Sequence, residues 1–321
     1  MSRKFRRCLA SVALGLGIAA QALPVASQDF PSKPMQIVIP VPPGGAMDWL
    51  TRAVGAELEK RWKRPVVVDN KAGAGGLIAS QAVARAPADG HTLLLINSAV
   101  TGYPVFVKTD FDVERDLVPL ASAMETPYVL FANAELPQRT LQAVAAYSKS
   151  AKLNIAMIPS STQNLKSARV LQGAGIEAAN VPYNGAGPVL RALLANEVQL
   201  YLGTPFGITE QVKAGKLVAL AVAGSTKIAD LPDAPTTRSL GINVEEGEWY
   251  AFFAPKGTPS AVTAKLSHEI VAIASLPEFM SQIKTRGYEP RTIGPEQMVK
   301  LVAEESRLAR QTARALGIQP Q

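Results

Sequence analysis

The stretch from Val38 to Val54 reads VIPVPPGGAMDWLTRAV and joins an apolar run to a helical pattern through paired prolines and glycines. Its first part belongs to a β-rich run over 35–41, and its second part begins an amphipathic helix predicted over 47–62. The loop between them therefore lies at the carboxyl end of a strand and the start of a helix. In open α/β sheets, ligands bind at that position.

Short apolar runs and amphipathic segments continue to alternate along the chain. Strands are predicted at 35–41, 65–70, 91–97, 127–133, 153–159, 198–203 and 217–224. Helices are predicted at 47–62, 77–86, 140–149, 164–173, 186–195, 207–214, 259–274 and 295–315. Strand, loop and helix in alternation predict an α/β fold with mostly parallel sheets.

The predicted strands and helices are more numerous than a single sheet of modest size accommodates, so the sequence predicts two domains. The chain is expected to cross between them near residues 125–127 and again near 248–249. Domain 1 would then be discontinuous, made of 28–126 plus 249–321, and domain 2 would be the inserted segment 127–248.

The first 27 residues have the pattern of a secretory signal peptide. Four basic residues within positions 3–7 precede an apolar run of about 13 residues, shorter than the ~20 that a membrane-spanning helix needs. Cleavage after residue 22 or 27 would place the mature protein in the periplasm. It would also remove Cys8, the single cysteine, and lower the formal net charge from +7 to +3.

The remaining composition argues against several classes of function. The densest basic cluster, KRWKR at 60–64, is more typical of a solvated helix end than of a nucleic-acid surface. His91 and His268, without cysteine, do not suggest a zinc site. The sequence lacks a G-x-S-x-G elbow, a nucleophile beside a base and a prominent acidic pair. It therefore predicts a binding protein without catalytic residues, metal or cofactor, and without a nucleic-acid partner.

The loop at 42–48 offers backbone donors to a ligand. Glycine at 44 and 45 lets the backbone approach a ligand closely, and amides at a helix start suit a negatively charged oxygen. Asp48 is expected to cap the helix and orient the loop. A capped tight turn without a ligand is an equal alternative. The candidate ligand-binding residues here are Pro43, Gly44, Gly45, Ala46, Met47 and Asp48.

The second domain carries a polar cluster between a predicted strand and helix. Hydroxyl and amide side chains can receive a carboxylate without carrying charge, and ordinary capping would occupy about two of them. A later loop, VPYNGAG at 181–187, could line a cleft or form a structural turn. The candidate ligand-binding residues here are Ser160, Ser161, Thr162, Gln163, Asn164, Tyr183, Asn184 and Thr204.

Together these motifs resemble the Bug-type extracytoplasmic solute receptors of tripartite tricarboxylate transporters. The matching segments include PPGGAMDWLTR at 42–52, VVVDNKAGAGG at 66–76, PADGHTLL at 87–94, NVPYNGAGPVLRALL at 180–194 and WYAFFAPKGTP at 249–259. The resemblance implies a two-lobed, Venus-flytrap periplasmic-binding-protein fold that holds a small organic acid between its lobes. It also implies membrane transporter subunits as partners, and we expect a monomer.

The sequence departs from the family pattern in the second lobe. Members usually carry a histidine where Asn164 stands, and many carry an aspartate where Gly203 and Thr204 follow the strand. These differences change the charge and hydrogen bonds available to the far end of a ligand. We expect the loops at 44–48 and 160–164 to face each other across the cleft. The same features also fit a ligand-sensing partner of a membrane signalling protein and, less well, a secreted enzyme.

Overall fold

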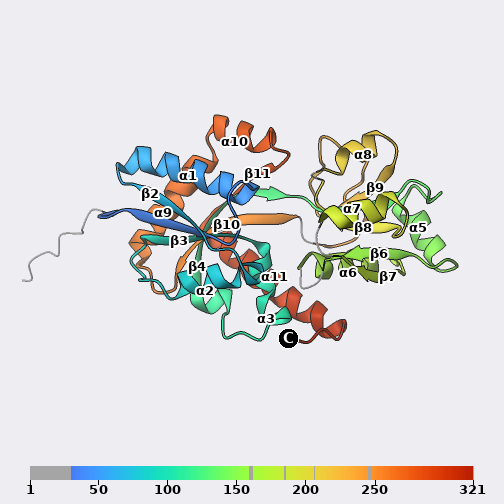
Figure 1. The fold of residues 1–321 in the computed structure, drawn as a ribbon, viewed down its shortest axis with the longest axis horizontal. Coiled ribbons are helices and arrows are strands. Elements are labelled where there is room, and N and C mark those ends of the chain that lie inside the picture. The colour runs from blue at the N-terminus through green and yellow to red at the C-terminus, as the bar shows by residue number, and fades with distance from the viewer. Residues whose placement is uncertain (1–29, 159–161, 184–185, 206, 245–246, 321) are drawn as a thin grey trace, which may run out of the picture.

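The computed structural model describes residues 30–158, 162–183, 186–205, 207–244 and 247–320 (Figure 1). Within these ranges the chain forms two lobes, each built on its own sheet. Lobe 1 contains a six-stranded sheet in the order β11-β4-β10-β3-β1-β2. Lobe 2 contains a five-stranded sheet in the order β7-β6-β8-β5-β9. The signal peptide predicted over the first 27 residues lies outside the described ranges.

The strands of lobe 1 are β1 (Met35–Ile39), β2 (Val66–Asn70), β3 (Thr92–Asn97), β4 (Leu117–Thr126), β10 (Glu248–Pro255) and β11 (Glu289–Ile293). The helices of lobe 1 are α1 (Ala46–Trp62), α2 (Leu77–Ala84), α3 (Tyr103–Phe106), α4 (Val113–Asp116), α9 (Ser260–Ala274), α10 (Pro277–Lys284) and α11 (Pro295–Ala315). Two 3₁₀ turns, η1 (Ala74–Gly76) and η2 (Ser98–Gly102), follow β2 and β3.

The strands of lobe 2 are β5 (Val129–Asn133), β6 (Asn154–Met157), β7 (Ala179–Pro182), β8 (Leu200–Gly203) and β9 (Leu217–Val222). Its helices are α5 (Leu141–Ser148), α6 (Thr162–Ala174), α7 (Ala186–Leu194) and α8 (Thr209–Lys213). A 3₁₀ turn, η3 (Arg238–Leu240), lies in the segment that returns to lobe 1.

Both faces of the lobe 1 sheet are covered, which explains the unbroken apolar character of its central strands. On one face, Ile37 packs in a cluster with Leu50 of α1 and Ile270 of α9. On the other face, Val38 packs in a cluster with Val83 of α2 and residues of α11. Each fully buried aliphatic side chain stabilises the folded protein by about 1.5–3 kcal/mol. Because Ile37 and Val38 point to opposite faces of the sheet, they help to hold helices on both sides of it.

The predicted two-lobed α/β fold is confirmed, but the sheets are mixed rather than mostly parallel. In lobe 1, β1 pairs in parallel with β2 and β3, whereas β10 is antiparallel to β3 and β4. In lobe 2, β6 is parallel to β7 and β8, whereas β5 is antiparallel to β8 and β9. The crossing explains this pattern: β10 re-enters lobe 1 at the edge where β4 leaves it, so the two must run in opposite directions.

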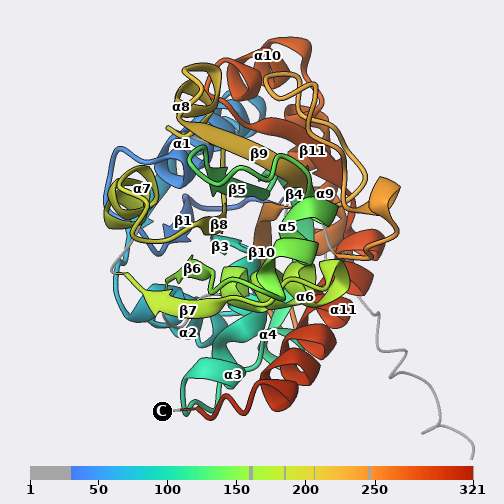
Figure 2. The same ribbon diagram turned by 90° about the vertical axis from the view of Figure 1, so that its right-hand side faces the viewer.

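The sequence reading missed the strands β4, β7, β10 and β11 and the helices α3, α4 and α10. Sheet membership changes between Thr126 and Val129 and again between Val222 and Glu248, where the chain passes from one lobe to the other. Away from these crossings, α6 of lobe 2 lies beside α11 of lobe 1 (Figure 2). None of the helices in the described ranges has both the length and the apolar character needed to cross a membrane.

Candidate functional site

The loops predicted as binding elements lie on the interlobe edges of the two sheets. In lobe 1, β3 ends at Asn97 opposite Tyr250, near the start of β10, which has just arrived from lobe 2. Strands β1 and β2 run parallel to β3 and end at the same edge. In lobe 2, β8 ends at Gly203 opposite Val129, the first residue of β5. The turns that follow these strands therefore border the region between the lobes.

The loop before α1 exposes its backbone at this edge. Pro43, Gly44 and Gly45 are exposed, whereas the side chain of Met47 is buried in the lobe 1 core. Helix geometry leaves the first amide groups of α1, those of Ala46 and Met47, without intrahelical acceptors. Only the backbone of Met47 is therefore available to a ligand, although the sequence marked the whole residue as a candidate.

Asp48 does not occupy the capping position expected from the sequence. The residue that caps α1 is Gly45, and Asp48 lies three positions further on. Its Oδ2 atom accepts the Gly44 amide at 3.0 Å, which removes that amide from the donors expected to hold a ligand. Asn70 donates to Oδ1 at 3.1 Å, and the Arg52 side chain donates to both oxygens. Asp48, in the first turn of α1, thus fixes the loop by bonding to the residue four positions before it.

The carboxyl group of Asp48 is ionised near neutral pH. Hydrogen bonding from the Arg52 guanidinium lowers the pKa of Asp48 to about 2, with further contributions from the Gly44 amide and Asn70 that oppose the effect of burial. The Arg52 side chain keeps 52% of its surface exposed, so water screens this ion pair. The start of α1 therefore carries a negative charge that is balanced by an adjacent exposed cation.

We expect Asp48→Asn to lower the free energy of unfolding by about 1–2 kcal/mol at pH 7, because it weakens the bonds to Arg52 and Gly44. The folded-state pKa lies below the unfolded value of 3.8, so this contribution is present above about pH 4 and is lost as pH falls towards 2. Urea denaturation from pH 7 to pH 3 measures it. Glu59→Gln, exposed on the same helix, should change stability by less than about 0.5 kcal/mol. Equal stability of Asp48→Asn and wild type at pH 7 would contradict this role.

The glycine-rich end of the segment 66–76, at residues 73–76, forms a packing turn between β2 and α2. The Tyr103 hydroxyl donates to the carbonyl of Gly75 at 2.9 Å. A Cβ on Gly76 would lie 2.4 Å from that hydroxyl oxygen, and Gly76 has φ +105°. Close approach and backbone conformation together explain why glycine stands there.

In lobe 2, the described polar side chains of the 160–164 cluster make structural contacts. The Asn164 amide is bonded to both backbone groups of Ile158, accepting its N–H at 3.2 Å and donating to its carbonyl. Gln163 donates to the carbonyl of Leu202. Thr162 packs against Gly102 of lobe 1. These contacts fix the first turn of α6, and they occupy the Asn164 amide that the sequence marked as a candidate ligand donor.

The other lobe 2 candidates have different surroundings. Tyr183 packs against the apolar cluster beneath α7, and burial together with Glu197 raises the pKa of its hydroxyl. Thr204 is half-buried after β8. The candidates Ser160, Ser161 and Asn184 lie outside the described residues.

A groove of about 580 Å³ opens between the lobes beside the end of β8. Lobe 2 contributes Pro205 and Glu210 to its wall, and lobe 1 contributes Lys284, Arg286 and Tyr288. The Arg286 guanidinium lies 4.2 Å from the ring centre of Trp49, the residue after Asp48 on α1. The groove therefore reaches towards the start of α1, and its size suits a small solute.

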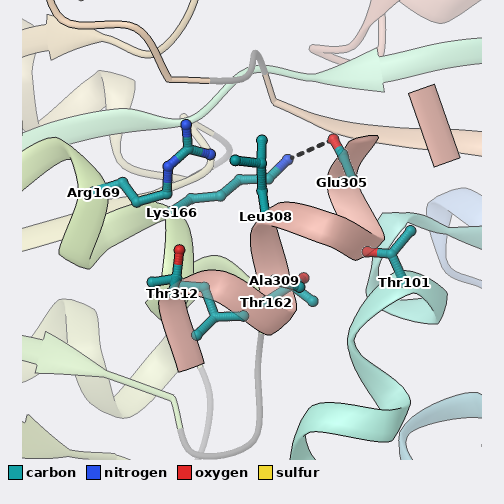
Figure 3. Close-up of a pocket in the computed structure, with 9 residues that line it drawn as sticks. Thr101, Thr162, Lys166, Arg169, Glu305, Leu308, Ala309 and Thr312 are labelled. Atoms are coloured by element: carbon teal, nitrogen blue, oxygen red, sulfur yellow. Dashed lines mark hydrogen bonds and ion pairs between the residues drawn. The ribbon is translucent and has the colours of Figure 1, made fainter. Parts of the chain in front are cut away.

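A second interlobe contact joins α6 to α11 (Figure 3). Lys166 of α6 lies 3.2 Å from Glu305 of α11, with 7% and 5% of the two side chains exposed. Lys166 also donates to the carbonyl of Gly247 at 2.8 Å. The cavity beside them measures about 20 Å³, room for roughly one water molecule, so this contact is structural rather than a solute site.

The sequence reading missed a polar group at the crossing itself. Glu248, the first residue of β10, accepts a hydrogen bond from Asn97 at 2.8 Å and another from the Tyr250 hydroxyl at 2.9 Å. Residues 97 and 248 are far apart in sequence, so spacing could not reveal the contact. The acidic run EEGE at 245–248, directly before the apolar run WYAFFAP, was the one available signal. Across the part of the chain that is described, no three His, Cys, Asp or Glu residues gather as metal ligands would.

A sequence profile of the family described as "Tripartite tricarboxylate transporter family receptor" matches residues 50–318. The chain is 34% identical over 313 residues to a UPF0065 protein of Pseudomonas sp. (strain P51), covering 94% of this chain and 91% of that protein. It is 30% identical over 306 residues to the protein BugT of Bordetella pertussis, covering 93% and 94%.

Solved structures show the same fold. A TctC solute binding protein from Polaromonas, without ligand, aligns with a TM-score of 0.81 at 23% identity, covering 89% of this chain and 99% of that one. MatC from Rhodopseudomonas palustris, with bound malate, aligns at 0.68 and 29% identity, covering 88% and 100%. The R. palustris protein Rpa4515, with adipate, aligns at 0.73 and 26% identity, covering 91% and 100%.

Proposed function

The chain belongs to the tripartite tricarboxylate transporter receptor family, and we propose that it captures a small organic carboxylate between its two lobes. It then delivers this acid to the membrane subunits of such a transporter. Similar proteins whose structures contain malate or adipate support an organic acid as the ligand. A small-molecule receptor of this kind works in the periplasm, as a monomer, without a catalytic step.

The observation that carries this proposal is the exposed start of α1 at the interlobe edge. The amides of Gly45, Ala46 and Met47 stand where the dipole of a 17-residue helix is positive. Charge-assisted hydrogen bonds from such donors to a carboxylate contribute about 1.5–3 kcal/mol each. Asp48 and Arg52 keep the loop in shape while nearly cancelling each other's charge. One carboxylate of the ligand lies on these amides.

The ligand's other end contacts lobe 2 at the turns that follow β6 and β8. A ligand that touches both lobes stabilises the arrangement in which they are closed. The lobes move as units whose boundaries lie at 126–127 and 248–249, with residues 28–126 and 249–321 in one unit and 127–248 in the other. The loops at 44–48 and 160–164 then face each other across the closed cleft.

A thermal-shift screen of mono- and dicarboxylates, followed by calorimetry, tests this function. A ligand at 100 times its dissociation constant should stabilise the folded protein by about 2.7 kcal/mol, which raises the melting temperature measurably. Matched amides of the same acids serve as controls, because they keep the shape and lack the charge. If no acid stabilises the protein more than its amide does, the proposed function is wrong.

A further inference from the structure

Glu248, the first residue of β10, lies where the chain crosses back into lobe 1, opposite Thr126 at the end of β4. Its carboxylate is held from two sides, by the Asn97 amide at 2.8 Å and by the Tyr250 hydroxyl at 2.9 Å. The hydroxyl of Tyr128, in the outgoing crossing segment, lies close enough to favour the ionised carboxyl group as well. The carboxylate is therefore oriented by groups from β3, from β10 and from the crossing.

Groups from both lobes surround this carboxylate. Burial raises the pKa of Tyr201, on β8 of lobe 2, and that of Tyr288, before β11 of lobe 1, and the Glu248 charge adds to both rises. Tyr128, Tyr201 and Tyr250 are buried, at 2%, 3% and 8% exposure, whereas Glu248 is only half-buried. Tyr288 also lines the interlobe groove. Tyr250, which bonds the carboxylate, packs edge-on against Tyr288, with ring centres 6.4 Å apart. The carboxylate thus lies near the interlobe groove, at the same edge of the lobe 1 sheet as the start of α1.

The chemistry of this group distinguishes between ligands. An ionised carboxyl group has about four acceptor positions and no donor. Asn97, Tyr250 and the nearby Tyr128 hydroxyl fill at most three of them, which leaves one for a ligand. Burial raises the pKa of Glu248, while the hydrogen bond from Tyr250 and the charge of Lys166 oppose that rise. A second carboxylate placed here would be repelled, whereas a hydroxyl or ammonium group would find a pre-oriented acceptor.

We propose that Glu248 determines specificity in the interlobe site by accepting a hydrogen bond from a donor on the ligand's carbon chain. That donor is a hydroxyl or ammonium group, so the receptor selects substituted acids over plain dicarboxylates. The inference rests on the proposed function, because it assumes that an organic acid binds between the lobes.

Calorimetry with matched acids tests the inference. The probes are succinate, malate and aspartate, together with glutarate, 2-hydroxyglutarate and glutamate, so that each chain length is compared with and without a donor. Wild type should bind the best donor-bearing acid at least about tenfold more tightly than the plain acid of equal length. In Glu248→Gln this preference should fall to within about threefold, and the plain acid should bind more tightly than it does to wild type.

Glu135→Gln is the matched control, because Glu135 is an exposed carboxylate that accepts a hydrogen bond from Asn196 and follows β5 at the end away from the interlobe edge. It should keep the wild-type preference. Tyr250→Phe, which removes one hydrogen bond that orients Glu248, should reduce the preference about threefold and provides a test if Glu248→Gln does not fold. An unchanged preference in a folded Glu248→Gln or Tyr250→Phe variant would overturn the inference while leaving the proposed function standing. Failure of every acid to bind wild type would overturn both.

Discussion

Gly45→Val is expected to fold like the wild type and to bind the organic acid at least tenfold more weakly, a loss of about 1.4 kcal/mol or more. Gly45 has φ −85°, a conformation open to any residue, and a Cβ there meets no described atom within 4 Å. The valine side chain would instead occupy the space in front of the amides of Ala46 and Met47. Calorimetry with the acid found in the screen measures the effect.

Gly294→Val is a closely matched control. Gly294 precedes α11 just as Gly45 precedes α1, with φ −75°, and among the described residues a Cβ there also meets nothing within 4 Å. It follows β11, which runs away from the interlobe edge. Valine is a poorer capping residue than glycine, so each variant should lose up to about 1 kcal/mol of stability. Gly294→Val should bind the acid as tightly as wild type does. If Gly45→Val also binds it that tightly, the ligand does not lie on the α1 loop.

Lys166→Met is expected to lower the free energy of unfolding by about 3–5 kcal/mol, the largest effect on stability that we predict. The lysine and Glu305 are both buried, and methionine would leave the Glu305 charge without the partner that lies 3.2 Å from it. The Gly247 carbonyl would also lose its donor. Urea denaturation followed by circular dichroism measures the change.

Lys213→Met provides the exposed counterpart. Lys213 lies 3.0 Å from Glu210, but 50% and 75% of the two side chains are exposed. Its replacement should cost less than about 1 kcal/mol. The double variant Lys166→Met, Glu305→Met should recover most of the loss, because neither side chain then carries a buried charge. A loss below about 1 kcal/mol in Lys166→Met alone would show that the interlobe ion pair contributes little to stability.

The elements that could be predicted from sequence are those whose patterns are local. Strand β1 ends in the apolar run Ile37–Ile39 because both of its faces are buried, and α1 follows it with a clear amphipathic pattern. Strand β4 carries Pro119 and several small residues, which hide its strand character. The direction of β10 follows from where the chain re-enters lobe 1, a consequence of topology that local patterns do not contain.

In the candidate site too, local features could be predicted from sequence, whereas contacts between distant residues could not. The sequence placed a glycine loop at the start of α1, where the structure shows it exposed, because composition and position define such a loop. It misplaced Asp48, because an acid early in a helix can either cap it or reach back from the third position, as Asp48 does to Gly44. It also marked Asn164 as a ligand donor, although that amide is bonded to Ile158. Glu248 went unnoticed, because its partner Asn97 comes from a distant strand.

The central claim is that the ligand's carboxylate lies on the first amides of α1, and amide NMR during titration with the acid tests it most directly. New charge-assisted hydrogen bonds should move the amide proton resonances of Ala46 and Met47 strongly downfield. The Gly44 amide, already bonded to Asp48, should move much less. If the acid saturates the protein while the resonances of Ala46 and Met47 stay in place, the carboxylate is held elsewhere.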